Sequence, residues 1–145
     1  LLVRDRGEFE LDYQLLIYPM IDDTRTTVTA NWDVPVWDCE SNYFGWQSYL
    51  GDLFDTEDVP IHAAPARAVD LSGLPRAYVM TGTLDGFADE DVAYAQRLNQ
   101  AGVPTELHVY PGAPHGFDGF APGTAVARQA RSDINDFLGR MLSPS

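Results

Sequence analysis

The amino-acid sequence predicts an α/β fold in which about three parallel strands carry helices on their faces. The first observation behind this is a set of three short apolar runs, at residues 14–19, 76–82 and 104–110. Each run has the length of a strand and is too short for a typical helix. The second observation is a helical pattern between the last two runs, which makes a strand–helix–strand unit.

Each run carries its own strand signature. Residues 14–19 (QLLIYP) are continuously apolar and stop at a proline, which suits a strand buried on both faces. Residues 76–82 (RAYVMTG) form a second such run. Residues 104–110 (PTELHVY) alternate, which places Leu107 and Val109 on one face of the strand.

Two helices accompany these strands. Residues 89–101 begin with three acidic residues, which suit the positive end of a helix dipole, and Gly102 follows as a C-terminal cap. Because a strand–helix–strand unit normally forms a parallel pair with a right-handed crossover, the last two strands should be neighbours. Residues 124–142 carry apolar side chains at helical spacing, so a terminal helix should pack on the sheet.

Residues 31–75 differ from the rest and are interpreted as an insertion with one or two short helices. Long connections in a compact α/β domain are usually binding elements or lids. The alternative is that the aromatic side chains form a small core of their own. The aromatic residues concerned are Trp32, Trp37, Tyr43, Phe44, Trp46 and Tyr49.

Composition excludes several classes of partner. The formal net charge of the 145 residues is -13 and every basic residue is arginine, so nucleic acid and anionic membranes would be repelled. No apolar run is long enough to span a membrane. The single cysteine, Cys39, cannot form an intrachain disulfide, and the three histidines are too dispersed to suggest a zinc site. The compartment stays open, with the cytoplasm as the working expectation.

Two residues whose side chains can take part in acid–base catalysis follow neighbouring strands of the predicted sheet. Asp85 comes after the second strand and His115 after the third. Ligands of open α/β sheets bind outside the carboxyl ends of the strands, so Asp85 could accept a ring N–H from His115 and orient it as a general base. Alone, Asp85 fits a turn and His115 a structural loop. Together, in this order, they match the last two members of an acid–histidine triad.

Four stretches together resemble the hormone-sensitive-lipase-like carboxylesterases of the α/β-hydrolase fold. They are residues 14–23 (QLLIYPMIDD), 64–78 (APARAVDLSGLPRAY), 81–103 (TGTLDGFADEDVAYAQRLNQAGV) and 110–117 (YPGAPHGF). The resemblance covers nearly the whole chain, in order. It implies that residues 1–145 are the C-terminal part of one catalytic domain and that residues 31–75 contribute to a cap over the acyl pocket.

The resemblance also assigns site residues. Asp85 matches the family's triad acid and His115 its triad base. The neighbouring loop positions of the family, which we expect to bind substrate, match Gly86, Phe87, Gly116 and Phe117. The family usually has Pro and Arg where Gly86 and Ala88 stand here, which bears on the rigidity of the loop.

The family's nucleophile motif does not occur in the chain. That motif is a Gly-x-Ser-x-Gly elbow, accompanied by an HGGG-type loop that supplies oxyanion donors. None of the six serines has glycines at both flanking positions. The resemblance places the nucleophile before Leu1. Cys39 is a poor substitute, because it lies in the insertion and no strand-to-helix elbow surrounds it.

The expected function is hydrolysis of small carboxylic esters with short or medium acyl chains through an acyl-enzyme, without a cofactor. Related α/β-hydrolases are an alternative, since prolyl-oligopeptidase-like peptidases and dienelactone hydrolases have similar histidine loops. A non-catalytic ligand-binding protein on the same scaffold is another, although such proteins commonly lose the histidine that is retained here. If the chain acted alone, the strand at residues 14–19 would present an open edge, so we expect either poor solubility or self-association into a homo-oligomer through that edge.

Overall fold

The computed structural model of the protein describes residues 1–142 and contains one sheet of three parallel strands. The strands are β1 (Tyr13–Ile17), β2 (Arg76–Leu84) and β3 (Thr105–Pro114), and they lie in this order across the sheet. This confirms the predicted α/β class and the parallel pairing of the last two strands. β2 and β3 run past their predicted ends, because they go on pairing beyond Gly82 in a shifted register.

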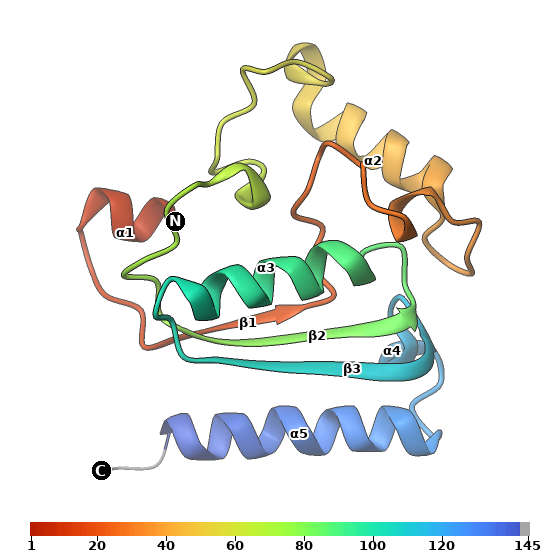
Figure 1. The fold of residues 1–145 in the computed structure, drawn as a ribbon. Helices are drawn as coiled ribbons and strands as arrows, with labels where there is room; N and C mark the ends of the chain where they lie inside the picture. The colour runs from red at the N-terminus through yellow and green to blue at the C-terminus, as the bar shows by residue number, and fades with distance from the viewer. Residues whose placement is uncertain (143–145) are drawn as a thin grey trace.

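Helices cover both faces of the sheet, as Figure 1 shows. α3 (Ala88–Gln100) lies on one face and α5 (Ala125–Leu142) on the other. The three acidic residues predicted at the helix start lie in the first turn of α3, and Gly102 beyond its end has a φ of +82°. Such a backbone conformation favours glycine, so the chain can turn sharply into β3.

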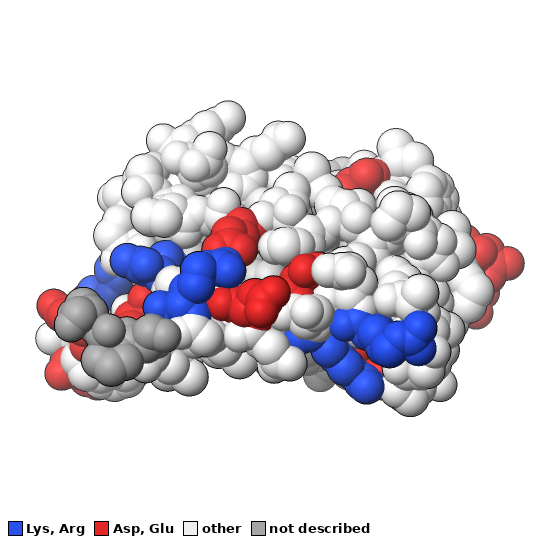
Figure 2. All heavy atoms as spheres, turned by 90° about the horizontal axis from the view of Figure 1, so that it is seen from below, with Lys and Arg blue, Asp and Glu red and all other residues white. Residues whose placement is uncertain are grey.

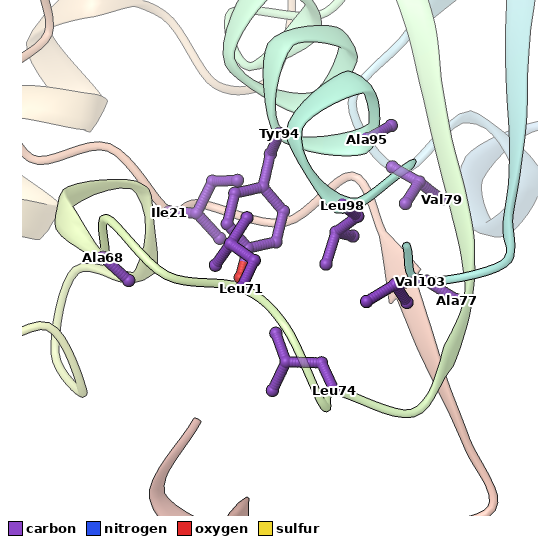
Figure 3. Close-up of a cluster of buried hydrophobic side chains, with 10 residues drawn as sticks. All are labelled: Ile21, Ala68, Leu71, Leu74, Ala77, Val79, Tyr94, Ala95, Leu98 and Val103. Carbon is purple, nitrogen blue, oxygen red and sulfur yellow. The ribbon is translucent and has the colours of Figure 1, made fainter. Parts of the chain in front are cut away.

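Between the sheet and α3 lies the first part of the core, drawn in Figure 3. Ala77 and Val79 of β2 face α3, which contributes Ala95 and Leu98. Ile21, Leu71 and Leu74 close the cluster from the loops beside it, so the connections around the sheet share in the core.

The other part of the core lies between the sheet and α5. Because successive side chains of a strand point to opposite faces, Tyr78 and Met80 of β2 pack here with Phe137 of α5. Leu107 and Val109 of β3 remain 37% and 41% exposed. β3 is the outer strand and α3 packs chiefly against β2, which leaves those side chains only partly covered.

The surface on the α5 side carries separate groups of arginine and acidic side chains (Figure 2). Arg140 of α5 pairs with Glu106 of β3 at 2.5 Å. Another arginine of α5, Arg131, donates to the backbone carbonyl of Asp118 in the short helix α4 (Phe117–Phe120). Arg140 thus links α5 to β3, and Arg131 links α5 to α4.

The chain between β1 and β2 forms helix α2 (Cys39–Leu50) and three 3-10 turns, η1 (Thr29–Asn31), η2 (Gly51–Leu53) and η3 (Pro65–Arg67). Asp38 caps α2 by accepting a hydrogen bond from the Ser41 amide at 2.8 Å. Part of this segment has a small core, made of Trp46, Leu50, Val59 and Ala64.

The first residues form helix α1 (Leu2–Arg6), which ends at Gly7 in the left-handed conformation. Arg4 donates to the backbone carbonyls of Asp70 and Ser72, so α1 is tied to the loop that precedes β2. Among residues 1–142, no helix is both long and apolar enough to cross a membrane.

Candidate active site

The candidate site lies where β2 and β3 end side by side. A Cβ on Gly82 would come within 2.0 Å of the carbonyl oxygen of Ala113, so only glycine allows the two strands to approach this closely. Beyond this point Leu84 pairs with Pro114. The residues that follow, Asp85 and His115, are therefore carried to the same edge of the sheet.

Asp85 and His115 are in direct contact. His115 Nδ1 lies 3.1 Å from Oδ2 of Asp85. The other carboxylate oxygen, Oδ1, accepts a hydrogen bond from the Phe87 amide at 3.0 Å. Asp85 is fully buried, whereas the side chain of His115 is 23% exposed. The acid is thus fixed at both oxygens and the histidine reaches the surface of the site.

This arrangement suits proton transfer at Nε2 of His115. A hydrogen bond from Nδ1–H to a carboxylate selects the tautomer whose Nε2 is unprotonated. Among residues 1–142, Nε2 has no hydrogen-bond partner. The ring can therefore accept a proton from a group placed beside it.

The imidazole borders a cavity of about 360 Å³. Phe87 meets the His115 ring edge-on, with ring centroids 5.4 Å apart, and the indole of Trp37 lies 6.2 Å from it. The walls are mostly apolar, which suits an uncharged organic group. The lining residues are Ile17, Tyr18, Met20, Trp37, Phe87 and His115.

The remaining predicted site residues take different positions. Phe87 lines the cavity. At Gly86 an added Cβ would meet the backbone carbonyls of Trp37 at 3.5 Å and Thr29 at 3.6 Å, and Gly116 precedes α4 with a φ of +69°. Phe117 is buried in the core toward α5, away from the cavity. Of the four loop residues, only Phe87 faces the candidate site.

The sequence analysis missed Tyr18 and Met20, which line the cavity together with Ile17. These three residues lie at or just after the end of β1. The rule that ligands bind at the carboxyl ends of parallel strands applies to β1 as well, so it could have found them. Trp37, from the insertion at residues 31–75, lines the cavity. Of the six aromatic residues named for that insertion, Trp46 is the one in its small buried cluster, whereas Tyr43, Phe44 and Tyr49 are exposed.

The first turn of α3 fastens the loop after β1 beside the site. Glu90 Oε1 accepts hydrogen bonds from the Ile21 amide at 2.8 Å and the Asp22 amide at 3.1 Å. One residue earlier, Asp89 Oδ2 accepts from the Thr29 amide at 3.0 Å. The acidic residues that the sequence analysis assigned to the helix dipole therefore also hold the chain that leads into the insertion.

Two buried carboxyl groups lie behind Asp85. Burial raises the pKa of Glu90 to about 8, although the Ile21 and Asp22 amides oppose the shift. Burial, together with the charge of Glu90, raises the pKa of Asp91 well above its ordinary value. The neutral form of Glu90 and of Asp91 is therefore favoured. This avoids placing two further negative charges near that of Asp85. In the described part of the chain, no cluster of three His, Cys, Asp or Glu side chains could hold a metal ion.

A comparison with known protein families agrees with this architecture. A family model described as the alpha/beta hydrolase fold covers residues 1–119. The chain belongs to this family. The predicted resemblance to the hormone-sensitive-lipase-like carboxylesterases is confirmed, because the curated relatives of the α/β-hydrolase chain are esterases.

Two curated relatives of the α/β-hydrolase chain come from Mycobacterium tuberculosis. Esterase LipI is 33% identical over 129 residues, which make up 88% of this chain and 40% of LipI. Carboxylesterase NlhH is 37% identical over 133 residues, which make up 89% of this chain and 41% of NlhH. The α/β-hydrolase chain thus spans about two fifths of the length of these relatives and corresponds to their C-terminal portion.

Solved esterase structures share the fold of the α/β-hydrolase chain. A bacterial heroin esterase superposes with a TM-score of 0.93 at 38% identity, covering 98% of this chain and 46% of that structure. An esterase of Pyrobaculum calidifontis gives a TM-score of 0.84 at 33% identity, covering 97% of this chain and 46% of that structure. The family to which the chain belongs is therefore one of ester hydrolases.

Proposed function

We propose that this chain supplies the acid and the base of a Ser–Asp–His triad that hydrolyses carboxylic esters with short or medium acyl chains. The observation that carries the proposal is the 3.1 Å contact between His115 Nδ1 and buried Asp85, with the imidazole at the wall of an apolar cavity. The esterase relatives support the same reaction class.

In the proposed mechanism, His115 Nε2 takes the proton of a serine hydroxyl as that oxygen attacks the ester carbonyl. The imidazolium then returns the proton to the departing alcohol, which leaves an acyl-enzyme. A water molecule, activated by the same nitrogen, hydrolyses the acyl-enzyme and restores the serine. Asp85 holds the tautomer of His115 and stabilises its transient positive charge.

The nucleophile and the oxyanion donors are proposed to come from a part of the polypeptide outside these residues. The esterase relatives are more than twice as long as the matched region, which supports this origin. A further support is the free edge of β1, which pairs only with β2 among the described strands. We propose that a strand carrying the serine elbow pairs with that edge, that residues 1–145 belong to one catalytic domain, and that residues 31–75 form part of its cap.

Two other functions remain as competing hypotheses. A peptidase or dienelactone hydrolase would use the same acid and histidine on a different carbonyl substrate. A non-catalytic ligand-binding protein would need the cavity but not the contact between Asp85 and His115. Parallel assays on open-chain esters, lactones and peptide amides distinguish the three kinds of enzyme. Turnover of any of these substrates distinguishes an enzyme from a binding protein.

The test is covalent labelling of the full-length protein with a fluorophosphonate, followed by intact-mass spectrometry. We expect one label on a serine in the wild type and strongly slowed labelling in His115→Ala, because the serine then lacks its base. Ester turnover should fall in parallel. An unlabelled wild type, or a His115→Ala variant that hydrolyses esters at the wild-type rate, would refute the proposed triad.

A further inference from the structure

Tyr18, the residue after β1, has an unusual backbone conformation at the edge of the candidate site. Its φ is +36°, in the left-handed region that side chains other than glycine rarely adopt, and Pro19 follows it. A residue before proline ordinarily takes an extended conformation, so the surroundings must hold this one. The Tyr18 amide donates to the Met80 carbonyl at 2.7 Å, which anchors it to β2. Such conformations cluster at functional sites.

The aromatic ring of Tyr18 packs against the imidazole of His115. The two ring centroids are 4.6 Å apart and the planes meet at 62°. Phe87 also meets the imidazole edge-on, and Asp85 holds its Nδ1. The contact with Tyr18 comes from β1, whereas those with Phe87 and Asp85 come from the loop after β2. Residues that follow two different strands, β1 and β2, therefore limit the rotation of the imidazole.

The phenol of Tyr18 is tied to the segment that follows His115. Its O–H donates to Oδ1 of Asp118 at 2.9 Å. Asp118 belongs to α4, which begins two residues after His115, and Arg131 of α5 binds its backbone carbonyl. Burial, followed by the hydrogen bond and charge of Asp118, raises the pKa of Tyr18 to about 12. The phenol therefore keeps its proton and stays a donor.

We infer that Tyr18 is a positioning residue for His115: its ring packs against the imidazole, and its hydrogen bond to Asp118 fixes the histidine loop relative to β1. The inference rests on the proposed function, because it gives His115 a geometry to maintain during proton transfer. Asp85 sets the tautomer of the imidazole, and Tyr18 with Asp118 sets its place. Tyr18→Phe keeps the ring and the cavity wall and removes only the hydrogen bond.

The test compares variants of the full-length protein in ester hydrolysis, with rates normalised to fluorophosphonate-titrated sites. We expect Tyr18→Phe to lower kcat about tenfold while KM stays within about twofold. Asp118→Ala should do the same, whereas Asp118→Asn, which keeps a carbonyl acceptor, should retain most of the wild-type kcat. The double variant Tyr18→Phe/Asp118→Ala should be no slower than either single variant, because both remove one interaction.

The matched control is Tyr13→Phe, which removes a phenol at the opposite end of the same strand and should leave kcat unchanged. A wild-type kcat in Tyr18→Phe, or losses that multiply in the double variant, would overturn the positioning role. His115→Ala is measured alongside. If the wild type is active and His115→Ala is not, a normal Tyr18→Phe rejects this inference alone. If His115→Ala is as active as the wild type, the proposed function fails.

Discussion

The backbone of Gly82 in β2 lies against the carbonyl group of Ala113 in β3, so closely that a methyl group at position 82 would stand 2.0 Å from the carbonyl oxygen. Gly82 and Ala113 lie near the ends of β2 and β3, and Asp85 and His115 are the first residues after those strands. This approach lets the strands stay paired through their shifted register. The distance between Asp85 and His115 thus depends on position 82 being a glycine, which has no side chain.

Gly82→Ala should therefore destabilise the protein, because the added methyl forces β2 and β3 apart. We expect the free energy of unfolding to fall by about 1–3 kcal/mol, the usual cost of overpacking, with the loss measured by denaturant titration. Gly119→Ala is the matched control, since a Cβ there meets nothing within 4 Å. Equal stability of the two variants would contradict the steric argument.

Asp85→Asn should impair turnover with little effect on folding. The asparagine carbonyl can still accept the Phe87 amide, but its NH₂ group would donate to His115 Nδ1 and leave the proton on Nε2, the wrong tautomer. We expect kcat to fall by about 10⁴-fold with little change in KM. The control is Asp91→Asn, which replaces a buried carboxyl group of α3. This variant should keep the wild-type turnover. Near-normal activity of Asp85→Asn would assign the pair a structural role.

The raised pKa of Glu90 predicts that the stability of the protein depends on pH. Its pKa is about 8 in the folded protein against an ordinary value of 4.5. Between these values the folded state binds more protons than the unfolded state, so the free energy of unfolding should fall as pH rises from about 4.5 to about 8, by several kcal/mol. Asp91, whose pKa is also raised, contributes in the same direction.

Glu90→Gln separates titration from hydrogen bonding in this prediction. Glutamine keeps the carbonyl oxygen that accepts the Ile21 and Asp22 amides but cannot ionise. In denaturant unfolding, the difference in the free energy of unfolding between about pH 5 and about pH 8, which span most of the range over which Glu90 titrates, should be smaller for this variant than for the wild type. A difference of the same size would assign the pH dependence to other groups.

Trp37 is expected to set the acyl preference of the proposed esterase. Its indole lines the cavity beside His115, so Trp37→Ala enlarges the space and removes apolar contact area. We expect kcat/KM to fall about tenfold for the shortest esters and to fall less as the acyl chain lengthens. The measurement is kcat/KM across an ester series of increasing acyl length. Phe44→Ala, at a residue 68% exposed that does not line this cavity, should leave the preference unchanged.

Several parts of the fold and site were predictable because local patterns determine them. Apolar runs of strand length, the acidic start of α3 and Gly102 after it specify the strand–helix–strand unit. Once β2 and β3 are parallel neighbours, the residues after their ends must share an edge, so the proximity of Asp85 and His115 follows from topology.

The sequence by itself thus determined the α/β class, the order of its elements and the edge at which Asp85 meets His115. Only the tertiary structure decided which other side chains join them. Tyr18 and Trp37 reach the imidazole from segments about 100 and 80 residues away along the chain, and Phe117 turns into the core instead. The reason is physical: pattern and propensity act between near neighbours, whereas cavity walls arise from packing between distant segments, which no local pattern encodes.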